Sequence, residues 1–242
     1  ELSGHTVVDR STLVVTHLAE VVRRRAGRLL GRTDVKHLVD GVRATDPQVI
    51  EDLNAAGVTT VEIQRVLATL LDDGVPVRDL VRILEAVSER ARTIRTPEAL
   101  VEAARAELGP AITSALAAGG RLSAVTLAPS TESWLLTGLR SVDGTTQLEV
   151  LPQETDALVG QLTSVAHDGA MRGVTPVLVC SPSLRPALGR LVRSTVPGLP
   201  VVSYHELGDH LDIEVVGSID LETRPRPPRD PEDLTDAVAS HR

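Results

Sequence analysis

The segment from 205 to 210 holds residue types that could ligate a metal ion or carry protons. His205 and His210 flank Glu206 and Asp209, and imidazole and carboxylate groups serve both purposes in proteins. Their spacing differs from the His-Glu-x-x-His pattern, which places two histidines on one face of a helix. The segment also falls in a polar turn between two predicted strands. A solvated loop is therefore the favoured interpretation, and an enzyme that uses His205, Glu206 and His210 is kept as an alternative hypothesis.

Cys180 is a second candidate for chemistry, because it is the only cysteine and ends a predicted strand just before Ser181-Pro182. A cysteine at a strand end can act as a nucleophile where a helix N-terminus lowers the pKa of its thiol. The sequence places no histidine or acid beside it, so we interpret Cys180 as a buried structural residue. The His167-Asp168 pair lies in a predicted helix and is interpreted as exposed.

Motifs for nucleotide or acyl chemistry are missing from the sequence. It contains neither the phosphate loop G-x-x-x-x-G-K-[ST] nor a G-x-G-x-x-G that follows a strand, and the nucleophile elbow G-x-S-x-G is also missing. A single cysteine permits no intrachain disulfide. We therefore predict no catalytic residue, no cofactor and no bound metal.

The composition narrows the range of partners. The chain has 242 residues, with 25 Lys and Arg against 33 Asp and Glu and a formal net charge of −8. This balance argues against a broad surface for nucleic-acid phosphates. Tyr204 and Trp134 are the only Phe, Tyr or Trp residues, so a platform for stacking single-stranded bases is nearly excluded. No window approaches ~18 consecutive apolar residues, the length that suggests a membrane-spanning helix.

Apolar periodicity predicts helices through the first half of the chain. Thr59 and Glu62 form a capping-box pattern, and Asp46-Pro47 and Thr96-Pro97 are typical helix starts. The helix that begins at Thr96-Pro97 is expected to end near Gly109-Pro110, because that pair usually interrupts a helix. The predicted segments are 11–30, 33–44, a helix from 46, 59–72, 77–91, 96–109 and a short apolar segment to 118.

After Gly119-Gly120 the pattern changes to short strands that alternate with helices. The continuous apolar run at 176–180 is typical of a strand covered on both faces. Beyond Asp220 the sequence is rich in proline and charge, which favours a disordered tail. The predicted strands are 122–127, 176–180, 199–203 and 211–219, with a short extended piece or loop edge at 147–151, and the predicted helices are 129–139, 152–172 and 183–195.

These elements predict an α+β fold. An N-terminal all-α helical subdomain at 31–118 is followed by a small α/β subdomain at 119–220, with a mixed, partly parallel sheet. A Pro-rich tail at 221–242 ends the sequence.

Four stretches of the sequence, taken in order, resemble one family. They are TVVDRSTLVVTHL at 6–18, LLGRTDVKHLVD at 29–40, VLATLLDDGVPVRDLVRILEA at 66–86, and VLVCSPSLRP at 177–186 with VVSYHEL at 201–207. Together they are similar to the cytoplasmic region of the FlhA/SctV family, also called the FHIPEP family. Its members are the large export-gate subunits of flagellar and virulence type III secretion systems.

The resemblance implies a non-enzymatic role in binding and gating. In this family a membrane domain precedes several cytoplasmic subdomains, which assemble into a nine-membered ring beneath the export channel. Residues 1–30 then correspond to the end of the first cytoplasmic subdomain, with its connecting helix, and 31–118 to the ring-forming helical subdomain. The implied location is the cytoplasmic face of the bacterial inner membrane, with membrane contact only through a missing N-terminal region. This piece itself is expected to be soluble and cytoplasmic.

The resemblance also implies partners. These are further copies of the chain in a homo-oligomeric ring, export chaperones and substrates, and other export-apparatus proteins, but no nucleic acid. The predicted protein-binding residues are Thr16, Arg78, Asp79, Arg185, Tyr204 and Glu206. A stand-alone, truncated cytosolic homologue with a scaffolding or regulatory role is the alternative hypothesis.

Overall fold

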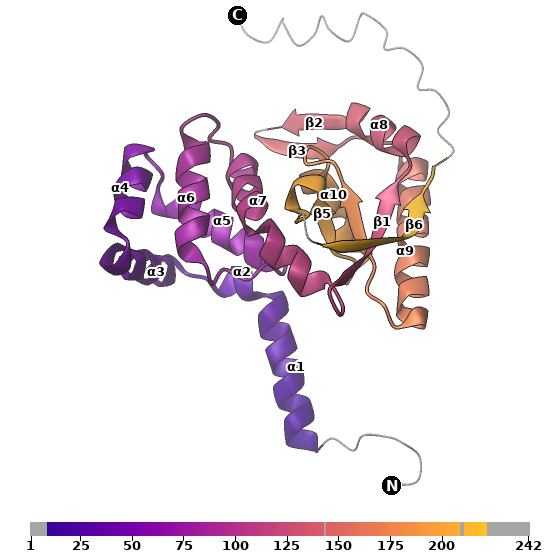
Figure 1. Cartoon of the computed structure of the whole chain (residues 1–242), viewed down its shortest axis with the longest axis horizontal. Helices are drawn as coiled ribbons and strands as arrows, with labels where there is room; N and C mark the ends of the chain where they lie inside the picture. Colours follow the sequence, from indigo (N-terminus) through magenta and orange to yellow (C-terminus); the bar gives the residue numbers. More distant parts are fainter. Residues whose placement is uncertain (1–8, 143, 209–210, 222–242) are drawn as a thin grey trace, which may run out of the picture.

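The structure is a computed structural model and describes residues 9–142, 144–208 and 211–221. Within these ranges helices come first, and a region of strands and helices follows, as the α+β prediction requires (Figure 1). The predicted tail lies outside the described residues, apart from Leu221. The first helices are α1 (Arg10–Arg24), α2 (Ala26–Leu29), α3 (Arg32–Thr45), α4 (Pro47–Ala55), α5 (Thr60–Asp72), α6 (Leu80–Ala91) and α7 (Pro97–Leu116).

Side-chain caps set the starts of several helices. The capping box that opens α5 is confirmed, because the Glu62 amide donates to Thr59 Oγ1 at 3.3 Å and the Thr59 amide donates to the Glu62 carboxylate at 2.8 Å. Asp79 caps α6 by accepting from the Arg82 amide at 3.3 Å, and Thr96 caps α7. These bonds satisfy backbone donors that a helix start leaves unpaired.

The second region contains a parallel four-stranded sheet, with the order β5-β4-β1-β6, and a separate antiparallel pair of β2 and β3. The mixed sheet predicted from the sequence therefore takes the form of two sheets. The elements are β1 (Arg121–Leu127), α8 (Pro129–Thr137), β2 (Leu139–Val142), β3 (Thr145–Leu148), α9 (Pro152–Arg172), β4 (Val177–Cys180), α10 (Arg185–Thr195), β5 (Val201–Ser203), the 3-10 turn η1 (Tyr204–Glu206) and β6 (Asp212–Ile219).

One face of the four-stranded sheet is covered by helices of the α/β part. The connections from β1 to β4 and from β4 to β5 move across the sheet in one direction, so right-handed crossovers place α9 and α10 on the same face. Leu178 and Cys180 of β4 share a core there with Leu158 of α9 and Leu188 of α10. The opposite face needs a cover from elsewhere in the chain.

That cover is α7, which lies between the other helices and the sheet (Figure 1). Val177 and Val179 of β4 belong to the same core cluster as Leu108 and Ile112 of α7, and this cluster extends through α3 to α6. Strands buried on both faces were predicted for 176–180, and this prediction is confirmed. The molecule therefore has two cores on opposite faces of the sheet, and the one beneath α7 is built jointly by the helical part and the α/β part.

The predicted helix end at Gly109-Pro110 is wrong, because α7 continues through this pair to Leu116. Proline removes one helical hydrogen bond and usually kinks or ends a helix. Here the neighbouring glycine admits another segment: a methyl group on Gly109 would lie 2.7 Å from the backbone of Glu206. The pair thus marks a close approach between α7 and η1, and packing outweighs the local cost of Pro110.

Two other expectations need correction. The predicted helix at 11–30 is interrupted at Arg25, which lies between the end of α1 at Arg24 and the start of α2 at Ala26. A short extended piece or loop edge was predicted at 147–151, whereas the strand β3 lies at Thr145–Leu148 and forms a hairpin with β2, with Val142 opposite Thr145. The Asp-Gly dipeptide at 143–144 is a strong signal for such a hairpin and could have predicted it.

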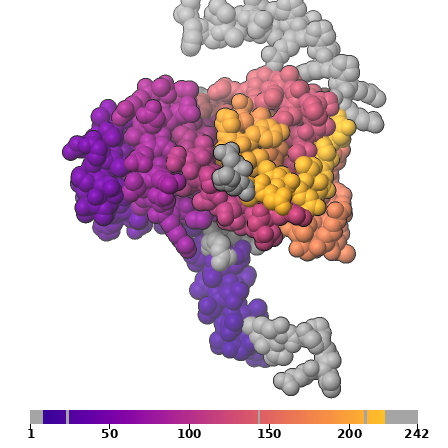
Figure 2. Space-filling model, in the orientation of Figure 1, coloured from indigo at the N-terminus to yellow at the C-terminus, as the bar shows by residue number. Residues whose placement is uncertain are grey.

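Helix α1 extends away from the body of the molecule (Figures 1 and 2). Its apolar side chains are exposed, with Leu13, Val14 and Val15 each at least 64% exposed and Leu18 at 59%. Within the described residues, no helix combines the length and the apolar character that crossing a bilayer requires.

Candidate functional site

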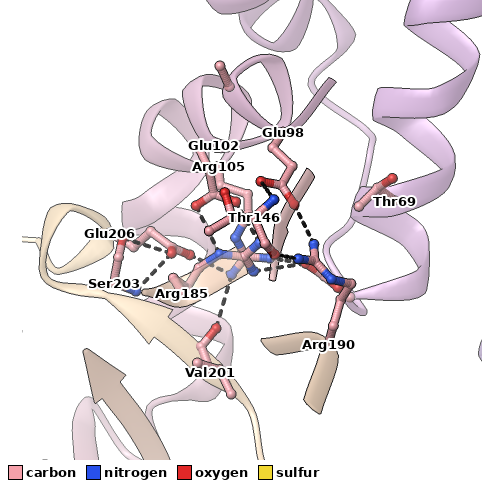
Figure 3. A network of polar contacts seen from close by, with 12 residues as sticks. Thr69, Glu98, Glu102, Arg105, Thr146, Arg185, Arg190, Val201, Ser203 and Glu206 are labelled. Atoms are coloured by element: carbon pink, nitrogen blue, oxygen red, sulfur yellow. Dashed lines mark hydrogen bonds and ion pairs between the residues drawn. The ribbon is translucent and has the colours of Figure 1, made fainter. Parts of the chain in front are cut away.

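The junction between the helical part and the α/β part contains a buried network of ion pairs (Figure 3). Arg105 of α7 donates to Glu206 of η1 at 2.6 Å and to Asp73, which follows α5, at 3.1 Å. The other Glu206 oxygen accepts from the Ser203 amide and hydroxyl at 2.9 and 3.0 Å. Both Arg105 and Glu206 are at most 2% exposed. A buried charge without its partner would be very unfavourable, so these residues must stay paired.

Arg185, at the start of α10, extends the network. Its guanidinium donates twice to Glu102 of α7, at 2.9 and 2.5 Å, and once to Asp73 at 2.9 Å. Burial alone would lower the pKa of Arg185, but the carboxylates of Glu102 and Asp73 outweigh it and raise the pKa. Arg185 is therefore a permanent charge that joins α10 to both α5 and α7.

Asp73 has an unusual position for a carboxylate, because it directly follows the C-terminal end of α5. The helix dipole disfavours a negative charge there. Arg105, Arg185 and Arg193 all contact it, with Arg193 at 2.5 Å, and they supply the compensating charge. Asp73 thereby ties the end of α5 to α7 and to α10.

A second polar bridge connects α7 to the β2–β3 hairpin. Glu98 accepts from the Thr146 amide at 2.8 Å and from Arg190 at 2.5 Å. Arg190 also donates to the Thr146 carbonyl oxygen. The backbone amide and carbonyl of Thr146 in β3 are thus both hydrogen-bonded to side chains from other elements.

A smaller polar cluster lies near the carboxyl ends of the parallel strands. The Glu132 carboxylate accepts from the Ser181 amide at 2.6 Å and from the Tyr204 hydroxyl at 3.2 Å. Partial burial and the Glu132 charge raise the pKa of Tyr204 to about 12. Burial also raises the pKa of the Cys180 thiol, which keeps it a thiol rather than a reactive thiolate.

The six predicted protein-binding residues do not form one surface. Thr16 is exposed on α1, Arg78 and Asp79 are exposed where α6 starts, and Tyr204 is partly exposed at 43%. The other two, Arg185 and Glu206, are buried in the ionic network described above. A protein-binding role for these residues stays a prediction.

Asp73, Glu102 and Arg105, three further members of the network, were not predicted from the sequence. A weak signal existed for Arg105, since it lies one helical turn from Val101 and from Leu108 and so interrupts an apolar stripe. The candidate metal group at 205–210 reaches only in part into the described residues, and its Glu206 is bound to Arg105 and Ser203. Over the described residues, nowhere do three His, Cys, Asp or Glu side chains gather in a way that could hold a metal ion.

Comparison with known proteins places this arrangement in a family. The FHIPEP family model matches residues 1–212. The flagellar biosynthesis protein FlhA of Escherichia coli K12 is 36% identical over 220 residues, which are 90% of this chain and 31% of the relative. The chain spans about a third of the length of such curated relatives.

Solved structures show the same fold. The nonameric EPEC SctV-C matches with a TM-score of 0.78 at 20% identity, over 86% of this chain and 63% of that chain. In the Chlamydia pneumoniae CdsV and CdsO protein complex, the match has a TM-score of 0.75 at 20% identity, over 86% of this chain and 61% of that one. Because the family model covers most of the sequence, and the fold agrees, this chain belongs to the FHIPEP family.

Proposed function

We propose that the chain is part of the cytoplasmic region of a type III protein-export gate and acts by binding rather than by catalysis. Family membership is the observation that carries this proposal. The chain would then form part of a homo-oligomeric ring at the cytoplasmic face of the bacterial inner membrane. The likeness to SctV-C, which is nonameric, supports a ring of nine.

The domain organisation follows from the same proposal. Residues 1–30 form the end of a first cytoplasmic subdomain, 31–118 the helical subdomain and 119–220 the C-terminal α/β subdomain. The exposed apolar side chains of α1 support the first assignment, because they lie close together on one helix, and contiguous exposed apolar patches usually mark a contact with another surface. In the longer protein, preceding residues would cover Leu13, Val14 and Leu18.

Export substrates, export chaperones and other apparatus proteins are the proposed partners. Likeness to a structure solved as a CdsV and CdsO protein complex supports contact with a second protein. Among the predicted binding residues, Thr16, Arg78, Asp79 and Tyr204 are accessible and would contact partners directly. Arg185 and Glu206 would act indirectly, by fixing α10 and η1 against α7.

Electron microscopy of the purified longer protein tests the proposal. Rings built from copies of the protein are expected, and a protein that stays monomeric at all concentrations, with its membrane segments intact, would contradict the ring. Such a monomer would instead favour the stand-alone scaffolding or regulatory homologue.

A paired substitution tests the assignment of α1. Leu18→Asp should leave the present chain folded, because the side chain is 59% exposed, but it should destabilise the longer protein and disrupt its rings. Met171→Asp on α9, where the side chain is 76% exposed, is the matched control and should be harmless in both. Equal tolerance of both substitutions in the longer protein would show that α1 has no such contact.

A further inference from the structure

A groove of about 530 Å³ lies where α2, α5, α7, β3 and α10 meet. Its volume falls within the range of roughly 300 to 1,000 Å³ that is common for ligand sites. The apolar side chains in its walls are few, namely Pro97, Val101 and Pro186. Charged side chains dominate the lining: Arg25, Arg28, Arg65, Arg185, Arg190 and Arg193 stand against Asp72, Asp73, Glu98 and Glu102.

The inner part of this groove is electrically balanced. Arg185 is paired with Glu102, Arg190 with Glu98, and Arg193 with Asp73. These are the contacts that hold the helical part to the α/β part, so they have little capacity left for a ligand. The inner arginines therefore serve the fold.

The rim of the groove is different. Arg25, Arg28 and Arg65 are exposed, and in the described ranges no ion pair involves any of them. Arg65 shares one face of α5 with Thr69 and Asp72. Among the described residues that line the groove, Asp72 is the only acid outside the ion pairs of the inner part. Three cations thus face one anion on a protein whose net charge is −8.

The rim chemistry fits carboxylates. A guanidinium presents its donors as a planar fork that binds a carboxylate through two parallel hydrogen bonds. One carboxylate carries a single negative charge, so a ligand that balances all three arginines must present more than one anionic group. The scarcity of apolar lining disfavours an apolar ligand. A nucleic acid needs a broad basic surface, whereas the unpaired arginines described here are confined to the rim of one groove.

We propose that this groove docks an acidic peptide segment of a partner protein. Its carboxylates pair with Arg25, Arg28 and Arg65 at the rim, and its backbone lies along the groove between α5 and α10. A peptide fills the volume better than a single small anion and can space its charges to match the rim. The inference goes beyond the proposed export role, since it requires neither a ring nor an apparatus, and its failure would leave ring formation untouched.

Fluorescence anisotropy with a labelled hexaglutamate peptide tests the groove at low ionic strength, where such contacts are screened least. The chain should bind hexaglutamate, whereas hexaglutamine of the same length should not bind. The double variant Arg28→Gln/Arg65→Gln should weaken binding by about tenfold or more, as expected when two charge-assisted contacts are lost.

Arg90→Gln/Arg172→Gln is the matched control. It removes the same charge from two exposed arginines on α6 and α9, for which the described residues show no ion pair, and it should bind like the unmodified chain. Circular dichroism confirms that all variants are folded. An equal loss in both double variants would mean unspecific attraction, and absence of binding would exclude the site. Full displacement of the peptide by millimolar inorganic phosphate would contradict the proposed peptide and would indicate a site for a small anion.

Discussion

Helices α7 and α1 are both long, yet their surroundings are opposite. Helix α7 has the sheet on one side and other helices on the other, and Leu100 and Ala104 are fully buried. Helix α1 stands apart from the body (Figure 2), and its Leu18 and Val15 side chains are exposed. Because tertiary packing supplies most helical stability in proteins, the two helices should respond very differently to substitution. Four predictions follow this contrast, from the largest effect to the smallest.

Removing the buried charge of α7 should have the largest effect. Arg105→Met keeps most of the side-chain volume but leaves Glu206 buried without its cation, and breaking such a pair costs roughly 3 to 5 kcal/mol in the free energy of unfolding. Adding Glu206→Gln should restore part of the loss, because it removes the unpaired charge. Urea unfolding followed by circular dichroism measures both.

The control for this prediction is Arg121→Met. Arg121, at the start of β1, pairs with Asp212 and Glu214 of the edge strand β6. These side chains are exposed, and exposed ion pairs contribute less than about 1 kcal/mol. A similar loss at Arg121 and Arg105 would contradict a special role for the buried network.

Truncating one leucine in each helix makes the comparison direct. Leu100→Ala in α7 opens a cavity in the shared core and should cost about 2 to 5 kcal/mol. Leu18→Ala in α1 should change the free energy of unfolding by no more than about 0.5 kcal/mol, because the side chain is already exposed. Thermal or urea unfolding measures the free energy of unfolding of both variants. Comparable losses of stability would show that α1 is packed in solution.

Gly109→Ala should destabilise α7 although alanine is the better helix former. The added methyl group would lie 2.7 Å from the backbone of Glu206, and such overpacking costs about 1 to 3 kcal/mol. Gly160→Ala in α9 meets no atom within 4 Å and should instead stabilise the chain by up to about 1 kcal/mol. If both alanines stabilise the protein, η1 does not pack on α7 as closely as described.

The smallest effect concerns the Asp9 cap at the start of α1. Hydrogen bonds from the Thr12 amide and hydroxyl lower the pKa of Asp9 below its usual 3.8. The charged cap is therefore complete above about pH 4, and it is lost as the pH falls through the lowered pKa. The Thr12 amide proton, followed by NMR, should lose its hydrogen-bonded signature on acidification.

Asp9→Asn is the control for this titration, because asparagine caps a helix without ionising. The Thr12 amide of that variant should be insensitive to acid over the same range. If the unmodified chain behaves in the same way, the Asp9 carboxylate does not hold the start of α1.

Features that depend on neighbouring residues were predictable from the sequence. The Thr59–Glu62 capping box and the strand at 177–180 are found close to their predicted positions, because caps and apolar runs act over a few residues. Helix α9 occupies the whole predicted range at 152–172. The family resemblance added the identity of the fold, which local patterns alone do not provide.

Features that depend on distant residues were not predictable in this way. Arg105 and Glu206 are 101 positions apart, and Arg185 and Asp73 are 112 apart, so no local pattern relates them. Gly109-Pro110 resembles a helix end because the residues that override it belong to η1. The candidate site was therefore identified only in part, through Arg185 and Glu206.

The parallel sheet also has a consequence for how the protein is made. Strand β1 pairs with β6, and partners such as Arg121 and Asp212 are 91 positions apart. At typical rates of synthesis the ribosome needs on the order of 5 to 20 seconds to add that much chain. Until then β1 lacks one of its neighbouring strands, and the apolar face of α7 is not yet covered by the complete sheet. The nascent protein should therefore depend on protection from aggregation for longer than a helical bundle of the same length.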